Sequence, residues 1–317
     1  MRLPLTQPRQ MIKRPRPVLQ SPLFLAILIT ALCGGCASSY QPMAAAGSDV
    51  PASTGSAAAA SKPSPATSGQ RVAAAAAGRV SSTYYTSAVS PLNRSSKVLL
   101  IGDSLTVGPF GDQVEAWLLQ NLGPSRVAVY GSCGSSPESW LASHKNFVTP
   151  CGFRETTSQG HILQEYQHNH RPGPVSTPKI ETLMAKYRPQ IVIIQLGTNH
   201  FDTLQREGKH SVTQLEDIYE AFANAVYGPG SSARMVIWIT PPDSSKFPKW
   251  VQDEVEHLIS STNQRHGFYT FQSRHFTHYT PASGSDGVHY NSAAAAAWAA
   301  PVIRMLDAAF TKFRVKN

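Results

Sequence analysis

Short apolar runs alternate with longer helix-like segments from Pro91 to Lys316, and this alternation limits the possible folds more than any other feature of the chain. The strand-like runs span residues 98–101, 126–130, 191–196, 235–240 and 268–271. The helix-like segments span residues 112–121, 178–186, 212–227, 249–263 and 292–313. Such alternation predicts right-handed crossovers and a parallel sheet with helices on both faces. We therefore predict an α/β fold of the flavodoxin-like, three-layer α/β/α type, with a five-stranded parallel sheet in the order 2-1-3-4-5.

The first strand leads into a short turn that contains a serine. Residues 98–101 are all apolar and predict a buried strand, which ends at Gly102. Asp103 and Ser104 follow, before an amphipathic segment that begins near Phe110. Ligands of open α/β sheets bind at the carboxyl ends of the strands. From this turn alone, Ser104 is either a nucleophile or the N-cap of the next helix.

Three more polar turns follow predicted strands or precede the last helix, at residues 130–136, 196–200 and 285–290. Acyl transfer needs a nucleophile, a base, a group that orients the base, and donors for the oxyanion. His289 is the candidate base for Ser104, and Asp286 is the candidate orienting group. The backbone amides of Ser104 and Gly134 and the side-chain amide of Asn199 are candidate oxyanion-hole donors, each typically worth about 3 kcal/mol in the transition state. Glycine suits position 134 because a Cβ there would crowd the substrate carbonyl.

Four motifs resemble the ordered blocks of the SGNH or GDSL hydrolase superfamily. They are Gly102-Asp103-Ser104-Leu105, Gly134, Gly197-Thr198-Asn199 and Asp286-Gly287-Val288-His289. The resemblance covers the chain from Val98 to the C-terminus. It implies a flavodoxin-like α/β/α fold and esterase chemistry without a metal or cofactor. It also implies that Ser104 is the nucleophile, that Gly134 and Asn199 belong to the oxyanion hole, and that Asp286 and His289 complete a catalytic triad.

The chain departs from that family pattern in two places. Family members often carry Asp after the Asn, whereas this chain has His200, which we expect to face the substrate. Gly131 and Gly134 both follow the second strand. We favour Gly134 for the oxyanion hole because Gly-x-x-Gly-x-Ser resembles the family pattern with its second glycine in the hole, and Gly131 is the alternative.

The N-terminal 36 residues have the composition of an export signal. Residues 1–20 hold five basic residues and no acidic one, and residues 23–32 form an apolar run of ten, too short to span a bilayer. The Leu-Cys-Gly-Gly-Cys sequence at 32–36 resembles the lipobox of bacterial lipoproteins, with Cys36 as the lipidated residue. Cys33 stands where such motifs usually carry an aliphatic residue, so ordinary signal cleavage is the alternative. We predict an exported protein of a bacterial cell envelope, either periplasmic or held at the membrane by a lipid anchor.

The rest of the chain divides into a linker and one domain. Residues 37–90 are rich in Ala, Ser and Pro with few large apolar side chains, which predicts a disordered tether. Residues 91–317 have the size of a single α/β domain, the hydrolase domain. The net charge of +9 falls to +4 without the five basic residues of the signal, and no cluster of Lys and Arg remains. We therefore expect no nucleic-acid partner.

Two cysteines, Cys133 and Cys151, lie outside the signal. In an exported protein we expect them to form a disulfide. A bridge across this segment would contribute about 3 kcal/mol by the chain-entropy estimate. It would also hold the turn beside Gly134.

Residues 131–178 form a connection longer than an ordinary loop, rich in Ser, Pro, Gly, His and Asn. It is a lid, a binding surface or an error in this interpretation. The histidines at 144, 161, 168, 170 and 200 match no zinc spacing, so we expect no metal. Four aromatic residues either stack on a sugar ring or pack in the core: Trp140, Tyr166, Trp250 and Tyr290.

These observations predict a serine esterase that removes O-acyl groups, acetyl first among them, from a cell-envelope or extracellular carbohydrate through an acyl-enzyme. The carbohydrate rests on the predicted location, the polar loop and the lack of a long apolar lid. A transacylase with a glycan acceptor, a lipase or lysophospholipase, and a non-catalytic binding module are the alternatives.

Overall fold

A computed structural model of the 317-residue chain describes residues 95–165 and 173–312. The predicted signal, the linker, Cys36 and Tyr166 lie outside these residues, as do the histidines at 168 and 170.

Strands and helices alternate along this part, with an added group of short strands after the second strand. The strands are β1 (Val98–Gly102), β2 (Val127–Ser132), β3 (Val148–Thr149), β4 (Gly152–Thr157), β5 (Gly160–Glu165), β6 (Val175–Ser176), β7 (Ile191–Gln195), β8 (Met235–Ile239) and β9 (Tyr269–Phe271). The helices are α1 (Ser104–Val107), α2 (Pro109–Leu122), α3 (Ile180–Tyr187), α4 (His200–Glu207), α5 (Val212–Tyr227), α6 (Lys249–His266) and α7 (Ser292–Lys312). Four 3₁₀ turns join them: η1 (Pro124–Arg126), η2 (Pro137–Trp140), η3 (Gly208–Ser211) and η4 (Ser273–His275).

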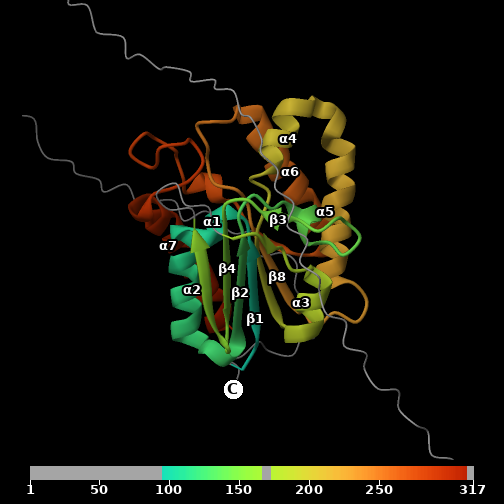
Figure 1. The fold of residues 1–317 in the computed structure, drawn as a ribbon, viewed down its shortest axis with the longest axis vertical. Coiled ribbons are helices and arrows are strands. Elements are labelled where there is room, and N and C mark those ends of the chain that lie inside the picture. Colours follow the sequence, from blue (N-terminus) through green and yellow to red (C-terminus); the bar gives the residue numbers. More distant parts are fainter. Residues whose placement is uncertain (1–94, 166–172, 313–317) are drawn as a thin grey trace, which may run out of the picture. The chain divides into compact units, whose positions relative to one another are not determined.

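The main sheet has the strand order β5-β4-β2-β1-β7-β8-β9. Five of these strands, from β2 to β9 in that order, are parallel, which confirms the predicted order 2-1-3-4-5. All five end at the same edge, where α1, α4 and β3 lie (Figure 1). The expectation of a five-stranded sheet was wrong in number, because β4 and β5 add an antiparallel hairpin beside β2.

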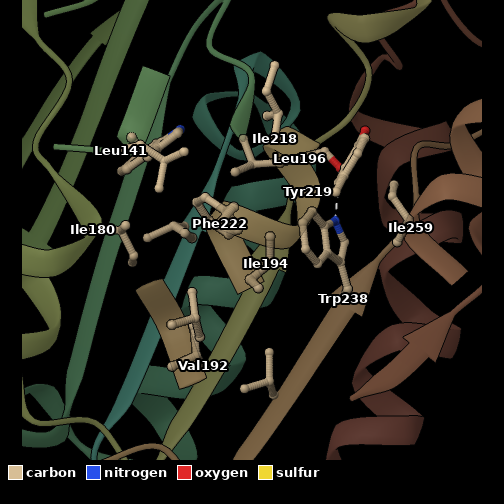
Figure 2. Packing of buried hydrophobic residues seen from close by; sticks show 14 of the residues in the cluster. Leu141, Ile180, Val192, Ile194, Leu196, Ile218, Tyr219, Phe222, Trp238 and Ile259 are labelled. Carbon is tan, nitrogen blue, oxygen red and sulfur yellow. Dashed lines mark hydrogen bonds between the residues drawn. The ribbon is translucent and has the colours of Figure 1, made fainter. Parts of the chain in front are cut away.

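Helices cover both faces of the sheet, as the three-layer prediction requires. Alternate side chains of β1 point to opposite faces: Val98 and Leu100 pack with α2 and α7, and Leu99 and Ile101 pack with α3, α5 and α6. Figure 2 shows the second of these cores, in which Trp238 of β8 lies beside Tyr219 of α5. The sheet is therefore buried on both sides, and its functional groups can lie only at its edges.

The long connection of residues 131–178 is not an irregular loop. It contains the β4–β5 hairpin and a small second sheet in which β3 pairs with β6. The Nζ of Lys179 donates hydrogen bonds of 3.1–3.2 Å to three carbonyl groups of the segment, those of Ser139, His144 and Lys145. The segment is thus built into the domain rather than laid over it.

Helix α7 begins as predicted, because the side chain of Asn291 accepts a 3.0 Å hydrogen bond from the amide of Ala294. It continues through Pro301 without a break. Of the described helices, α7 alone has the length and apolar composition of a membrane span. Trp298 and Leu306 are fully buried in the domain core, however, so its apolar face already has a partner.

Candidate active site

Ser104 stands at the carboxyl end of β1 as the first residue of α1, with its side chain partly exposed. The carboxylate of Asp103 caps this helix by accepting a 3.0 Å hydrogen bond from the amide of Leu105. A Cβ on Gly102 would meet the side chain of Thr106 at 1.9 Å. Glycine there lets the short helix fold back against its own strand and turn the Ser104 hydroxyl outward.

His289 and Asp286 lie in the loop between β9 and α7, and this loop meets Ser104. The Nε2 atom of His289 is 2.8 Å from Oγ of Ser104, and its Nδ1 atom is 2.5 Å from Oδ2 of Asp286. A carboxylate can only accept, so Nδ1 carries the proton and Nε2 is left to accept the serine hydroxyl proton. The structure thus brings the three predicted residues into one hydrogen-bonded chain.

The second oxygen of Asp286 accepts the backbone amides of Val288 and His289 at 2.9 and 2.8 Å. Burial acts to raise the pKa of Asp286, but the His289 hydrogen bond and these two amides hold it below its ordinary value. The lowered pKa favours the ionised carboxylate, which can accept the hydrogen bond from Nδ1 of His289.

The loop that carries His289 is fixed to the segment after β8. The carbonyl of Gly287 accepts hydrogen bonds from Oγ of Ser244 at 2.5 Å and from the amide of Ser245 at 3.1 Å. Gly287 has φ +82°, and a Cβ would lie 2.9 Å from Lys246. Glycine is needed at this position for both reasons.

Two loops next to Ser104 carry the predicted oxyanion donors. Gly134 lies just after β2 in a turn with φ +81°, and Asn199 precedes α4. The side-chain amide of Asn199 donates a 2.7 Å hydrogen bond to the carbonyl of Ser135. Because a carbonyl can only accept, the atom of Asn199 that faces it must be the amide nitrogen. The second N–H of this nitrogen is left for another acceptor. Gly131 lies inside β2, and a Cβ there would meet Val107 at 3.0 Å, so its glycine serves packing.

A disulfide joins Cys133 to Cys151 directly beside Gly134. The carbonyl of Cys133 also accepts a 2.8 Å hydrogen bond from Oγ1 of Thr149, and its amide donates to the carbonyl of Gly152 at 2.9 Å. The turn at Gly134 is therefore held by a covalent bond and by hydrogen bonds to β3 and β4.

Beneath Ser104, the carboxyl group of Asp103 is fully buried. Burial raises the pKa of Asp103 from its ordinary 3.8 to about 6, although the Leu105 amide, the side chains of Thr198 and Gln195 and the charge of His289 act in the opposite direction. A strongly shifted group so close to a hydroxyl–imidazole pair is typical of a functional site.

His200 does not face the substrate, so this prediction needs correction. Its side chain is 1% exposed, and both ring nitrogens have protein partners. Nδ1 is 3.0 Å from the hydroxyl of Tyr219, and Nε2 is 2.9 Å from Oε2 of Glu138. Sequence inspection missed Glu138 because it lies in the long segment after β2, and Tyr219 because it reads as one more core position of α5.

A small apolar crevice of about 20 Å³ opens beside Ser104 and His289. Leu105, Phe110 and Trp298 form its walls, and the rings of Phe110 and Trp298 are stacked at 3.7 Å. A space of this size accepts about one methyl group or water molecule.

Two of the four aromatic residues singled out above belong to the core. Trp140 is fully buried and Tyr290 is 6% exposed, with its hydroxyl bonded to the carbonyl of Asp243. Trp250 is 42% exposed on α6. Within residues 95–165 and 173–312, no group of three or more His, Cys, Asp or Glu side chains is arranged to hold a metal ion.

Comparison with known proteins gives a family match over most of the domain. Residues 98–302 match the family described as GDSL-like Lipase/Acylhydrolase. Protein BcsX of Komagataeibacter xylinus is 26% identical over 155 residues, which are 48% of this chain and 53% of that protein. The chain thus spans about half the length of this curated relative.

Two solved structures are similar in fold. One is a catalytic mutant of Axe2, an acetylxylan esterase from Geobacillus stearothermophilus, 14% identical over 68% of this chain and 95% of the other, with a TM-score of 0.47. The other is a lipase/acylhydrolase from Enterococcus faecalis, 18% identical over 67% of this chain and 96% of the other, with a TM-score of 0.44.

Proposed function

This chain belongs to the GDSL-like lipase/acylhydrolase family, and within that family of ester hydrolases we propose that it uses Ser104 as nucleophile, His289 as base and Asp286 as the group that orients the base. The observation that carries the proposal is the continuous chain of hydrogen bonds from the Ser104 hydroxyl through both nitrogens of His289 to Asp286. A proton can leave the serine only if such a base is within reach, and 2.8 Å is within reach.

The reaction follows from this arrangement in two halves. Oγ of Ser104 attacks the acyl carbonyl as its proton passes to Nε2 of His289, and the imidazolium then returns the proton to the leaving alcohol. This leaves an acyl group on Ser104. A water molecule then attacks the acyl-enzyme, again giving its proton to His289, which passes it to Oγ as the carboxylic acid departs. The amides of Ser104 and Gly134 and the free N–H of Asn199 would stabilise both tetrahedral oxyanions.

We propose that the acyl group is short, with acetyl preferred. The crevice beside Ser104 and His289 has room for about one methyl group, and the stacked rings of Phe110 and Trp298 line it. A long acyl chain would not fit into this crevice without displacing these buried core side chains. The alcohol side of the ester would be a carbohydrate of the cell envelope or the extracellular space, and this is supported by the polar loops around the site and by the N-terminal sequence.

We also propose that the protein is exported and that Cys36 carries the lipid anchor. The basic and apolar composition of residues 1–36 supports export. The disulfide between Cys133 and Cys151 supports an oxidising compartment. Metabolic labelling with a radioactive fatty acid would test the anchor, because a Cys36→Ser variant should lose the label whereas a Cys33→Ser variant should keep it.

Labelling with a fluorophosphonate probe followed by mass spectrometry tests the nucleophile. The label should lie on Ser104, and Ser104→Ala should lower p-nitrophenyl acetate hydrolysis by at least about 10³-fold while the circular dichroism spectrum is unchanged. A label on another residue would contradict the assignment. Release of free acetate from an acetylated glycan, against its transfer to an added glycan, distinguishes a hydrolase from a transacylase.

A further inference from the structure

The two loops that carry the proposed oxyanion donors are joined by two side-chain hydrogen bonds. The first runs from Nδ2 of Asn199 to the carbonyl of Ser135 at 2.7 Å. The second joins Nε2 of His200 to Oε2 of Glu138 at 2.9 Å. Ser135 follows Gly134 directly, and Glu138 lies in η2 just beyond it. The two loops are therefore tied to each other at two points, at Asn199 itself and at the residue that follows it.

The ring of His200 is held on both sides, so it can set the position of the loop that it contacts. Its ring is 1% exposed, and the hydroxyl of Tyr219, itself fully buried, is 3.0 Å from Nδ1. In Figure 2, Tyr219 lies in the core between α5 and the sheet, beside Trp238. The backbone amide of His200 also donates to the carbonyl of Gly197 at 3.0 Å. The ring of His200 is thus anchored to the core through Tyr219 and forms a hydrogen bond with the neighbouring loop through Glu138.

The electrostatics favour a strong bond at the Glu138 end. Burial acts to raise the pKa of Glu138, but the hydrogen bond and charge of His200, with the Ser136 side chain, lower it to about 2. Glu138 is therefore ionised at neutral pH, and Nε2 must be the donor. Tyr219 faces the other nitrogen, and Asp103 and Glu138 are the charged groups that act on Tyr219. A hydrogen bond to an ionised carboxylate is stronger than one between neutral groups.

We propose that His200 is a positioning residue of the oxyanion hole, which sets the separation of Gly134 and Asn199 through its hydrogen bond to Glu138. The inference rests on the proposed function, because it assigns a role within the same site. According to this proposal, activity depends on the hydrogen bond from His200 to Glu138 and not on the space that the ring fills. The hydrogen bond to Tyr219 only fixes the orientation of the ring.

Two substitutions separate the two bonds of His200. In His200→Gln the amide nitrogen falls near the position of Nε2, so the bond to Glu138 is kept and the bond to Tyr219 is lost. In His200→Asn the amide falls near the position of Nδ1, so the bond to Tyr219 is kept and the bond to Glu138 is lost. Asn is one methylene shorter than Gln, so packing alone would also favour the Gln variant, and Glu138→Ala, which leaves the ring in place, separates the hydrogen bond from the packing.

The readout is the kinetics of p-nitrophenyl acetate hydrolysis together with inhibition by a phenyl trifluoromethyl ketone, whose adduct with Ser104 carries an oxyanion. We expect His200→Asn and Glu138→Ala to lower kcat by roughly 10- to 100-fold with KM nearly unchanged, and to weaken the inhibitor by a similar factor. We expect His200→Gln to stay within about fivefold of the parent in both measurements.

His266→Ala is the matched control, because His266 forms the same kind of bond, 2.7 Å to Glu220, on the outer side of α5 and α6. It should keep the parent kcat. Equal kcat values for the Gln and Asn variants of His200, or a loss of kcat without weaker inhibitor binding, would overturn the inference while leaving the Ser104 assignment intact. A parent protein without esterase activity would overturn the proposed function and this inference together. Glu138→Ala decides the matter if the His200 variants do not fold.

Discussion

The guanidinium group of Arg154, on β4, donates a 2.7 Å hydrogen bond from Nη2 to the carbonyl of Val107, the last residue of the helix that begins with Ser104. The same side chain is 2% exposed and forms ion pairs with Asp112 and, at 2.6 Å, with Glu115. The hairpin that the sequence pattern did not reveal therefore supports the helix that presents the proposed nucleophile.

Replacing Arg154 should destabilise the domain strongly. Arg154→Ala would leave Glu115, which is 6% exposed, without its cationic partner, and removing one member of a buried ion pair costs about 3–5 kcal/mol. Urea unfolding followed by tryptophan fluorescence measures this loss. The double variant Arg154→Met/Glu115→Leu should regain most of the stability, because replacing both members by apolar groups is often neutral. A single variant as stable as the parent would contradict the buried pairing.

Substitution of Gly134 should impair catalysis more than stability. Its φ of +81° lies in the region that L-residues avoid, so Gly134→Ala should cost about 1–2 kcal/mol of folding free energy or shift the turn. The new Cβ would lie at ordinary contact distance, 3.4 Å, from Phe147 and Pro150, so the strain lies in the backbone, and a shift of the turn that relieves it should lower kcat at least about tenfold. Gly267→Ala, with φ +69° at the end of α6, is the matched control and should keep the parent kcat at a similar loss of stability.

Loss of the disulfide should lower stability and slow the enzyme moderately. The bridge closes a loop of 18 residues, so Cys133→Ser/Cys151→Ser should unfold with about 3 kcal/mol less free energy. The hydrogen bonds of the Cys133 backbone persist, so kcat should fall only a few-fold. Dithiothreitol should reproduce both effects in the parent protein and have none in the double variant. A reductant effect of the same size on both proteins would rule out this bridge as the cause.

The buried carboxyl of Asp103 should make the domain less stable as the pH rises. Its folded pKa of about 6 lies above its ordinary 3.8, so the folded protein keeps the proton over a range in which the unfolded chain has lost it. This contribution is complete below about pH 4 and is lost by the time the pH has passed through 6. Asp103→Asn should therefore be the more stable protein at pH 7, by up to about 3 kcal/mol, and should lose this advantage near pH 4. Thermal unfolding from pH 4 to 8 measures the difference, and parallel curves would refute it.

The parts of the fold that could be predicted are those with a periodic pattern. The five parallel strands are continuous apolar runs, because both faces of their sheet are buried, and their order follows from the crossover rules. Ser104, Asn199 and His289 stand out as polar residues just where strands end or the last helix begins, and the structure brings their loops together at one edge. No tertiary information is needed to see this.

What could not be predicted depends on partners far away in the sequence. β4 and β5 lie at an edge of the sheet and carry polar residues, so their pattern resembles a loop. Arg154 is charged and its position in the sequence predicts exposure, but the acidic groups of α2 and the carbonyl of Val107 account for its burial. His200 reads as a ligand-facing residue until Glu138 and Tyr219, 62 and 19 residues away, are seen to use both of its nitrogens.

The hydroxyl of Ser104 and the imidazole of His289 come from positions 185 residues apart, and β9 must be in place before the loop of His289 can reach the sheet edge. A chain cut short before position 289 would therefore carry the proposed nucleophile without its proposed base.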